Sequence, residues 1–278
     1  MKLDAHQHFW LYNSRDYGWI DDRMQVLKRN YLPGDLQPEL AKAGMSGSVV
    51  VQARQTMEET RWLLYLAGQN DYIKGVVGWV DLCSESDLKR QLDEFSKSKK
   101  FVGVRHVVHD EEEDNFMLRD DFLKGISLLK QYSITYDLLL FPKHLPVAEV
   151  IVAMFPEQKF ALDHISKPLI KNRVISPWKE DLIRLAAHTN VWCKLSGMAT
   201  EADWKRQKPE DFYPYLDIVF KAFGTDRLMI GSDWPVCLLA GEFSDVIGIV
   251  QDYISDMPVN VQQKILGKNC VECYGLEV

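Results

Sequence analysis

The stretch Asp4-Ala5-His6-Gln7-His8-Phe9-Trp10 places two histidines two residues apart near the start of the chain. Residues i and i+2 of a β-strand point to the same side, so His6 and His8 are expected to direct their imidazole rings at one point. The alternative interpretation is an ordinary alternating strand whose two histidines are satisfied by local hydrogen bonds. The rest of the chain bears on this choice, because other apolar runs also end in polar residues.

The chain that follows alternates between short apolar runs and segments with helical periodicity. The apolar runs are rich in β-branched residues, which is typical of strands buried on both faces. Strands are predicted at 47–52, 74–80, 101–108, 134–140, 159–164, 191–195 and 227–231. Helices are predicted at 36–43, 61–67, 121–131, 146–154 and 209–223, with two more near the C-terminus. Thr56 with Glu59 caps the helix at 61–67. The pairs Ser84/Asp87 and Ser176/Pro177 each begin a further helix.

Eight short strands that each precede a helix, within about 270 residues, predict a (β/α)8 barrel of the α/β class. We expect it to form a single domain over residues 1–278, since 278 residues with 46% hydrophobic content can bury a large core. The rival architecture is a doubly wound open sheet, which usually carries a glycine-rich first turn for phosphate groups. Ala5-His6-Gln7-His8 offers no such turn.

Charge and cysteine content exclude some partners and indicate a location. The net charge is −7 with Lys and Arg interspersed among acids, which argues against a nucleic-acid surface. No apolar run reaches the roughly 18 residues of a membrane span. Five cysteines and no charged-then-apolar leader predict a reduced, cytoplasmic protein. Cys270-x-x-Cys273 has the spacing of a redox or metal pair, but its context favours two buried helix cysteines.

Residues 10–35 form a long polar segment with five aromatic residues, Trp10, Tyr12, Tyr17, Trp19 and Tyr31. Connections of this length without regular structure are usually lids or binding loops, so we expect the segment to lie over the site. The alternative is a surface excursion with a few packed aromatic side chains.

Polar residues stand at the ends of the predicted strands. In a parallel barrel the active site lies at the C-terminal ends of the strands. Any one of these residues alone would be an ordinary core or rim residue, but their convergence on one rim predicts a catalytic site. The residues are His6, His8, Gln52, Trp79, Arg105, His106, Asp137, Asp163, His164, Lys194, Ser196 and Asp233.

These strand ends carry a family resemblance. His6-x-His8 on the first strand, His164 after the sixth and Asp233 after the eighth resemble the framework of the amidohydrolase superfamily. Further motifs, ordered along essentially the whole chain, resemble the sugar-lactone hydrolases of that superfamily, of the L-fuconolactonase and L-rhamnonolactonase type. They are Val51-Gln52-Ala53, Gly78-Trp79-Val80-Asp81-Leu82, Gly103-Val104-Arg105-His106, His144-Leu145-Pro146, Asp163-His164-Ile165-Ser166-Lys167-Pro168, Cys193-Lys194-Leu195-Ser196-Gly197-Met198 and Gly231-Ser232-Asp233-Trp234-Pro235-Val236.

Two departures from the family pattern bear on cofactor and substrate. The fifth strand, 134–140, has no histidine where metal-dependent members often supply a ligand, so any metal is expected to be loosely bound or dispensable. After the fourth strand the family tends to have Gln-Asp-Glu, whereas this chain has His109-Asp110-Glu111. The second departure indicates a shifted substrate preference.

Hydrolysis of a lactone needs an activated water, a place for the negative charge that develops on the carbonyl oxygen, and a proton for the leaving alkoxide. Asp233 is the predicted general base; its alternative role is to cap the turn before Pro235. His6, His8 and His164 would polarise the carbonyl, either directly or through one zinc or manganese ion that they bind together with Asp233. No organic cofactor is expected.

A polyhydroxylated ring also needs hydrogen-bond partners and an apolar wall. The residues predicted to bind it are Arg105, His106, Gln52 and Asp137 as polar partners, with Trp10 and Trp79 as the wall. A sugar-acid lactonase is therefore the first hypothesis. The second is a metal-dependent decarboxylase of the same superfamily, against which the missing fifth-strand histidine counts. The third is a barrel that only binds small sugars.

Overall fold

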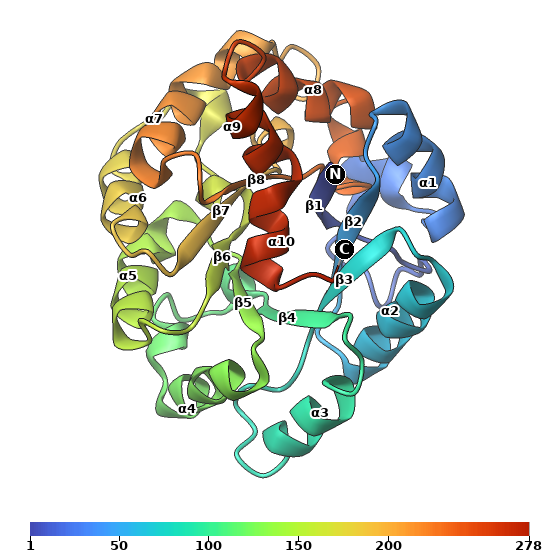
Figure 1. Ribbon diagram of the computed structural model, residues 1–278, viewed down its shortest axis with the longest axis vertical. Coiled ribbons are helices and arrows are strands. Elements are labelled where there is room, and N and C mark those ends of the chain that lie inside the picture. Colours follow the sequence, from blue (N-terminus) through green and yellow to red (C-terminus); the bar gives the residue numbers. More distant parts are fainter. Residues whose placement is uncertain (278) are drawn as a thin grey trace.

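The computed structural model describes residues 1–277, and its centre is a barrel of eight parallel strands (Figure 1). Each strand pairs with the next one along the chain, from β1 to β8. The strands are β1 Leu3–Gln7, β2 Gly47–Val51, β3 Ile73–Gly78, β4 Phe101–His106, β5 Thr135–Leu138, β6 Phe160–Leu162, β7 Val191–Leu195 and β8 Leu228–Ile230. The predicted (β/α)8 fold is confirmed.

The barrel closes where β1 meets the segment that follows β8. The backbone amide of Asp233 donates to the carbonyl of His6 at 2.8 Å, and the amide of His8 donates to the carbonyl of Trp234 at 2.6 Å. The pairing of β1 with β2 shifts in register between Asp4 and Gln7. The first and last strands therefore meet at the residues that the sequence marks for chemistry.

Ten α-helices follow the strands or close the chain within residues 1–277. They are α1 Pro33–Lys42, α2 Met57–Gln69, α3 Leu88–Phe95, α4 Asp120–Leu129, α5 Leu145–Met154, α6 Trp178–Ala186, α7 Tyr213–Phe223, α8 Phe243–Tyr253, α9 Val259–Gln263 and α10 Asn269–Tyr274. Thr56 caps α2, as predicted, by accepting a hydrogen bond from the amide of Glu59 at 3.2 Å. Helix α6 begins one residue later than predicted, with Pro177 at its N-cap. In the described part of the chain, no helix has the length and apolar character to cross a membrane.

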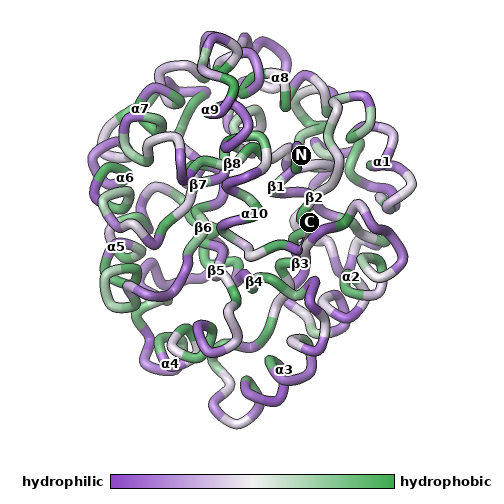
Figure 2. The backbone as a smooth tube through the Cα atoms, viewed as in Figure 1, coloured by the Kyte–Doolittle hydropathy of each residue, from purple (hydrophilic) through white to green (hydrophobic). Residues whose placement is uncertain are grey.

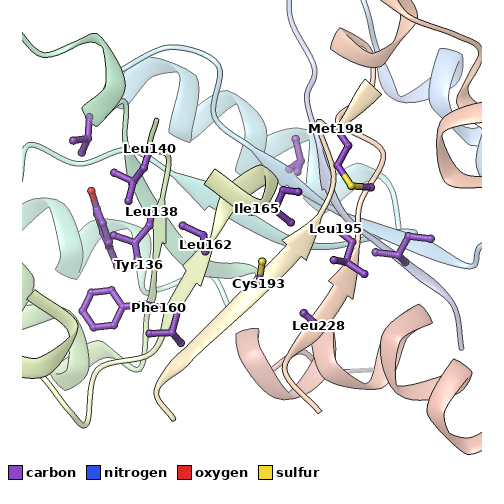
Figure 3. Packing of buried hydrophobic residues seen from close by; sticks show 14 of the residues in the cluster. Tyr136, Leu138, Leu140, Phe160, Leu162, Ile165, Cys193, Leu195, Met198 and Leu228 are labelled. Atoms are coloured by element: carbon purple, nitrogen blue, oxygen red, sulfur yellow. The ribbon is translucent and has the colours of Figure 1, made fainter. Parts of the chain in front are cut away.

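Apolar side chains fill the layer between the strands and the outer helices. Alternation along β6 sends Phe160 and Leu162 into this layer and turns Ala161 the other way, into a second cluster. Figure 3 shows the first layer around β5 to β8, where Leu138 and Leu195 belong to the same apolar packing. Along the outer helices hydrophilic and hydrophobic segments alternate in Figure 2, as helices with one buried face require.

Helix α10 lies across the centre of the barrel in Figure 1 and covers one end of it. Cys270, Cys273 and Tyr274 pack in the second cluster against strand residues such as Val49. Both cysteines are free and buried, in agreement with their interpretation as helix residues. The hydroxyl of Tyr274 lies 2.8 and 2.9 Å from the two carboxylate oxygens of Asp137. The helix that closes the barrel thus also supplies a hydrogen-bond donor to its interior.

Replacing Tyr274→Phe keeps the ring and removes the hydroxyl that serves the fully buried Asp137. A buried polar group that loses its partner costs about 1–3 kcal/mol, so we expect the free energy of unfolding in urea to fall by about that amount. Tyr253→Phe is the control, because Tyr253 pairs at 2.6 Å with the exposed Asp217, and exposed pairs contribute less than about 1 kcal/mol. Equal losses in the two variants would contradict a special role for the buried contact.

Candidate active site

Three histidines and one aspartate converge at the C-terminal ends of the strands. His6 Nε2 lies 3.2 Å from His8 Nε2. Asp233 Oδ1 lies 3.3 Å from His8 Nε2, 3.8 Å from His6 Nε2 and 3.9 Å from His164 Nε2. The four side chains are exposed by 5% or less. The structure therefore brings together the four residues that the sequence singles out for catalysis.

His164 stands in a left-handed turn that its sequence does not favour. Residues 164–167 all have positive φ angles, from 48° to 62°. Non-glycine residues in this region cost of order 1–3 kcal/mol each, and the β-branched Ile165 is especially unfavourable there. The turn is held by Trp178 Nε1, which donates to the carbonyl of Ile165 at 2.8 Å, and by Ser196 Oγ, which lies 2.9 Å from His164 Nδ1. With Nδ1 engaged, His164 directs Nε2 at the cluster.

Asp233 is positioned by a buried pair, Asp4 and Ser232, for which no role was predicted from the sequence. Ser232 donates its amide to Asp4 Oδ1 at 2.9 Å and its hydroxyl to Asp4 Oδ2 at 2.5 Å. Burial raises the pKa of Asp4 to about 6. Asp233 itself has a φ of 59°, so the pair anchors the backbone next to this unusual conformation. A usable signal was present in the sequence, because Asp4 lies two residues before His6 and Ser232 directly precedes Asp233.

Behind the histidines lies a buried group of charged side chains. Lys194 Nζ donates to Asp137 Oδ2 at 2.5 Å, contacts Asp163 Oδ1 at 2.9 Å and lies 3.1 Å from His6 Nδ1. Arg105 Nη1 donates to Asp163 Oδ2 at 3.0 Å and lies 3.3 Å from His6 Nε2. Burial alone would raise the pKa of Asp163, but Lys194, His6 and Arg105 outweigh it and hold this pKa well below its ordinary value. Asp163 is therefore an ionised partner for both cations.

The protonation states at the C-terminal mouth of the barrel allow Asp233 to act as a general base. Burial lowers the pKa values of His6 and His164 well below their ordinary value, so both rings are neutral at pH 7. Burial alone would raise the pKa of Asp233, but the neighbouring His164 and His8 outweigh it and lower the pKa. At neutral pH the mouth thus holds an ionised carboxylate near the neutral rings of His6 and His164.

His6, His8 and Asp233 fit a divalent metal ion such as zinc. His8 Nδ1 must donate to the carbonyl of Val51 at 2.7 Å, because a carbonyl only accepts, and this leaves a lone pair on His8 Nε2. Two ligands of a tetrahedral zinc, each about 2.0–2.1 Å from it, lie about 3.3 Å apart. The His6–His8 and His8–Asp233 spacings of 3.2 and 3.3 Å match this value. His164 belongs to a second group that could hold an ion, with His6 and Asp163.

A cavity of about 350 Å³ opens at this mouth. Its lining includes His8, Arg105, His164 and Asp233. Trp10, Trp19 and Met24 also line it, so the segment 10–35 lies over the site as its length and composition predict. The polar lining further includes Lys167 and Glu201, for which no binding role was predicted, and His109, which the family pattern linked to a shift in substrate preference.

Among the described residues that line the cavity, several expected substrate contacts are absent, namely Gln52, His106, Asp137 and Trp79. Gln52 instead holds the guanidinium of Arg105, whose Nη2 donates to the backbone carbonyl of Gln52. His106 follows Arg105 on β4 and turns the other way, where its ring stacks on Phe116 with centroids 4.9 Å apart and Nε2 lies 2.6 Å from Glu111 Oε1. This alternation places the ring of His106 outside the cavity lining, so its expected substrate contact stays a prediction.

Asp137 and Trp79 also lie outside the cavity lining, for different reasons. Asp137 lies inside the barrel, one layer behind the mouth, where its carboxylate accepts hydrogen bonds from Lys194 and Tyr274. Trp79 lies just beyond β3, where its backbone amide and carbonyl both bond to the hydroxyl of Thr60, at 2.8 and 2.9 Å. A position at a strand end was therefore not enough to place these two side chains in the cavity.

Comparisons with known proteins agree with this geometry. A model of the family described as amidohydrolase matches residues 3–276. A relative named L-fucono-1,5-lactonase, from Burkholderia multivorans, is 37% identical over 287 residues, covering 99% of this chain and 96% of that protein. A protein of the same name from Burkholderia ambifaria is 38% identical over 248 residues, covering 88% of this chain and 83% of that protein.

A solved structure extends the likeness to the whole fold. The crystal structure of an amidohydrolase from Burkholderia multivorans with bound Zn superposes with a TM-score of 0.96 at 37% identity, and the match covers 100% of both chains. The family model and the relatives span nearly the full sequence. This chain belongs to the amidohydrolase family.

Proposed function

We propose that this chain is a sugar lactonase, which opens a sugar-acid lactone of the L-fucono- or L-rhamnono-lactone type and acts as a single catalytic domain over residues 1–278. The observation that carries the proposal is the carboxylate of Asp233, buried beside His8 and lining a cavity large enough for one small ring. The relatives named L-fucono-1,5-lactonase support the choice of a lactone over other esters.

In this mechanism Asp233 takes a proton from water, and the water oxygen forms a bond to the lactone carbonyl carbon. The bond between that carbon and the ring oxygen then breaks, and Asp233 passes its proton to the leaving ring oxygen. His164 and Arg105 line the cavity and supply hydrogen-bond donors for the negative charge on the carbonyl oxygen. Asp163 holds the guanidinium of Arg105 at 3.0 Å, so this donor is fixed before substrate binds.

A divalent ion held by His6, His8 and Asp233 would polarise the carbonyl or its attacking water when bound. The side chains already supply a base and donors for each step, so the ion is loosely held or dispensable in this proposal. Arg105 Nη1 supports this, because at 3.3 Å from His6 Nε2 it competes for the same lone pair. On β5, the side chain that a metal could use as a ligand is Asp137. Its carboxylate is already bound by Lys194, which donates a hydrogen bond to it.

The partner in this proposal is a small-molecule lactone, with neither nucleic acid nor a membrane as a partner, given the net charge of −7. A cytoplasmic location is part of the same proposal. Its support is that all five cysteines are free, four of them buried, as expected in a reducing compartment.

The proposed activity is tested with a panel of 1,5- and 1,4-aldonolactones and a pH indicator. Ester opening at neutral pH releases one proton per turnover and no carbon dioxide, which is the expected result. Release of carbon dioxide from an unsaturated acid would favour the decarboxylase hypothesis instead. Turnover of neither class would leave a barrel that only binds sugars.

Asp233→Asn keeps the size and much of the hydrogen bonding of the side chain but removes its basicity. We expect kcat to fall by about 10²–10⁴-fold with little change in KM, because the lost step is chemical. The exposed Asp256→Asn is the control and keeps its rate. Near wild-type kcat in Asp233→Asn would return this residue to a turn-capping role.

The same base predicts the pH dependence. The pKa of Asp233 is lowered from 3.8, so kcat/KM of the wild type is lost only as pH falls through a value below 3.8 and the carboxylate is protonated. This acidic limb disappears from the residual activity of Asp233→Asn. His164→Asn lowers the rate but keeps the limb, because it leaves the proton acceptor in place.

Removal of metal separates the two ways of polarising the carbonyl. After dialysis against a chelator, we expect zinc content measured by atomic absorption to fall while most of kcat/KM remains. If activity vanished with a stoichiometric metal and returned only when the metal was added back, the metal-independent mechanism would be wrong.

A further inference from the structure

An ion pair lies in the cavity wall, apart from the catalytic cluster. Lys167, after β6, contacts Glu201, after β7, with Nζ and Oε1 3.2 Å apart. The two side chains are exposed by only 17% and 22%, and both line the cavity. A salt bridge in this position is shielded from most of the solvent, which strengthens its interactions, and it is still accessible to a ligand in the cavity.

The pair has unused hydrogen-bonding capacity. Within residues 1–277, Lys167 Nζ makes one hydrogen bond, to Glu201 Oε1, and an ammonium has three donors. The second carboxylate oxygen of Glu201 has no hydrogen bond to the described residues, while a carboxylate accepts at both oxygens. Donors and acceptors thus stand side by side in the wall.

His109 adds a second acceptor to the lining. Its Nδ1 is buried and has no hydrogen-bond partner among residues 1–277. The ring stacks on Phe141 with centroids 4.7 Å apart, which fixes its plane. Burial, and then the charges of Lys167 and Arg105, lower the pKa of His109 to about 3, so the ring is neutral and can accept at one nitrogen. A buried unpartnered nitrogen in a cavity wall is explained by a ligand that hydrogen-bonds to it.

We infer that the Lys167–Glu201 pair, together with His109, is the specificity determinant that recognises hydroxyls on neighbouring carbons of the lactone ring. A hydroxyl both donates and accepts, so one hydroxyl accepts from Lys167 while its neighbour donates to Glu201. This role replaces the one that the sequence gave to His106, which faces away from the cavity. The inference rests on the proposed lactonase function and adds which residues select the substrate.

The apolar lining fits the same ligand. Trp19, Met24 and Trp204 line the cavity together with these polar groups. Trp204 is oriented by its Nε1, which donates to the carbonyl of Thr200 at 2.8 Å. A ring with hydroxyls along one edge and a C–H face or methyl group matches a wall of this mixed chemistry.

The test compares two six-membered lactones, the best 1,5-aldonolactone of the panel and δ-valerolactone, which has no hydroxyls. The quantity measured is the ratio of their kcat/KM values in Lys167→Met, Glu201→Gln and His109→Phe. We expect this ratio to fall about 10–100-fold in Lys167→Met and about 10-fold in the other two variants. Lys167→Met and His109→Phe lose a hydrogen bond to a hydroxyl, and Glu201→Gln replaces a charged acceptor by a weaker neutral one. Lys167→Arg, which keeps the charge, recovers part of the ratio. The exposed Lys171→Met is the matched control and keeps the wild-type ratio.

If both lactones slow in parallel in Lys167→Met and Glu201→Gln, the pair acts on the reacting atoms and the inference is wrong. If the wild type opens no lactone, the proposed function fails, and binding decides the inference separately. The probes are then 1,5-anhydrohexitols, which carry ring hydroxyls without a carbonyl, titrated by calorimetry. Binding that weakens about tenfold or more in Lys167→Met supports the inference, whereas no binding by the wild type, or equal binding by the variant, overturns it.

Discussion

The active site depends on one buried ammonium group, that of Lys194 on β7. Its side chain is fully buried, as are its two carboxylate partners. A charge in the protein interior is costly unless it is paired and hydrogen-bonded, and removing one partner of such a pair is strongly destabilising. Lys194 Nζ donates to Asp137, contacts Asp163 at 2.9 Å and lies 3.1 Å from His6 Nδ1. The ring of His6 consequently lies against the same group that neutralises the two carboxylates.

This network connects the two ends of the barrel. Tyr274 of α10 donates a hydrogen bond to Asp137 from the closed end of the barrel. Asp163 accepts a hydrogen bond from Arg105, which lines the cavity at the other end. Burial raises the pKa of Asp137 to about 6, whereas Lys194 and the other cationic neighbours of Asp163 lower its pKa in spite of burial. Asp163 is therefore ionised to a lower pH than Asp137, and it is the carboxylate that lies next to the catalytic rim. The precision of the mouth is thus supported by charges that no substrate reaches.

The fold and the catalytic rim could be predicted because both follow from periodicity, which the sequence carries directly. The direction of a single side chain at a strand end could not. Arg105 and His106 are adjacent on β4, so they face opposite sides, and the sequence does not say which of them faces inward. Asp137 does face inward, but α10, about 130 residues later in the chain, decides how deep it lies by supplying Tyr274. Such long-range contacts leave no local signal.

The left-handed turn at residues 164–167 explains why Lys167 in particular escaped prediction. Propensity argues against a positive φ at Ile165, yet Trp178 and the packing around it impose one, and the turn carries both His164 and Lys167 to the cavity. A regular strand end would have supplied only one of them. His6 is thus tied to the buried ions, whereas the groups that face the rest of the ring stand on the loops after β4, β6 and β7. Because the loops after β4 and β7 can change without disturbing Lys194 or the turn that carries His164, substrate preference in this architecture can shift while the chemistry at Asp233 stays the same.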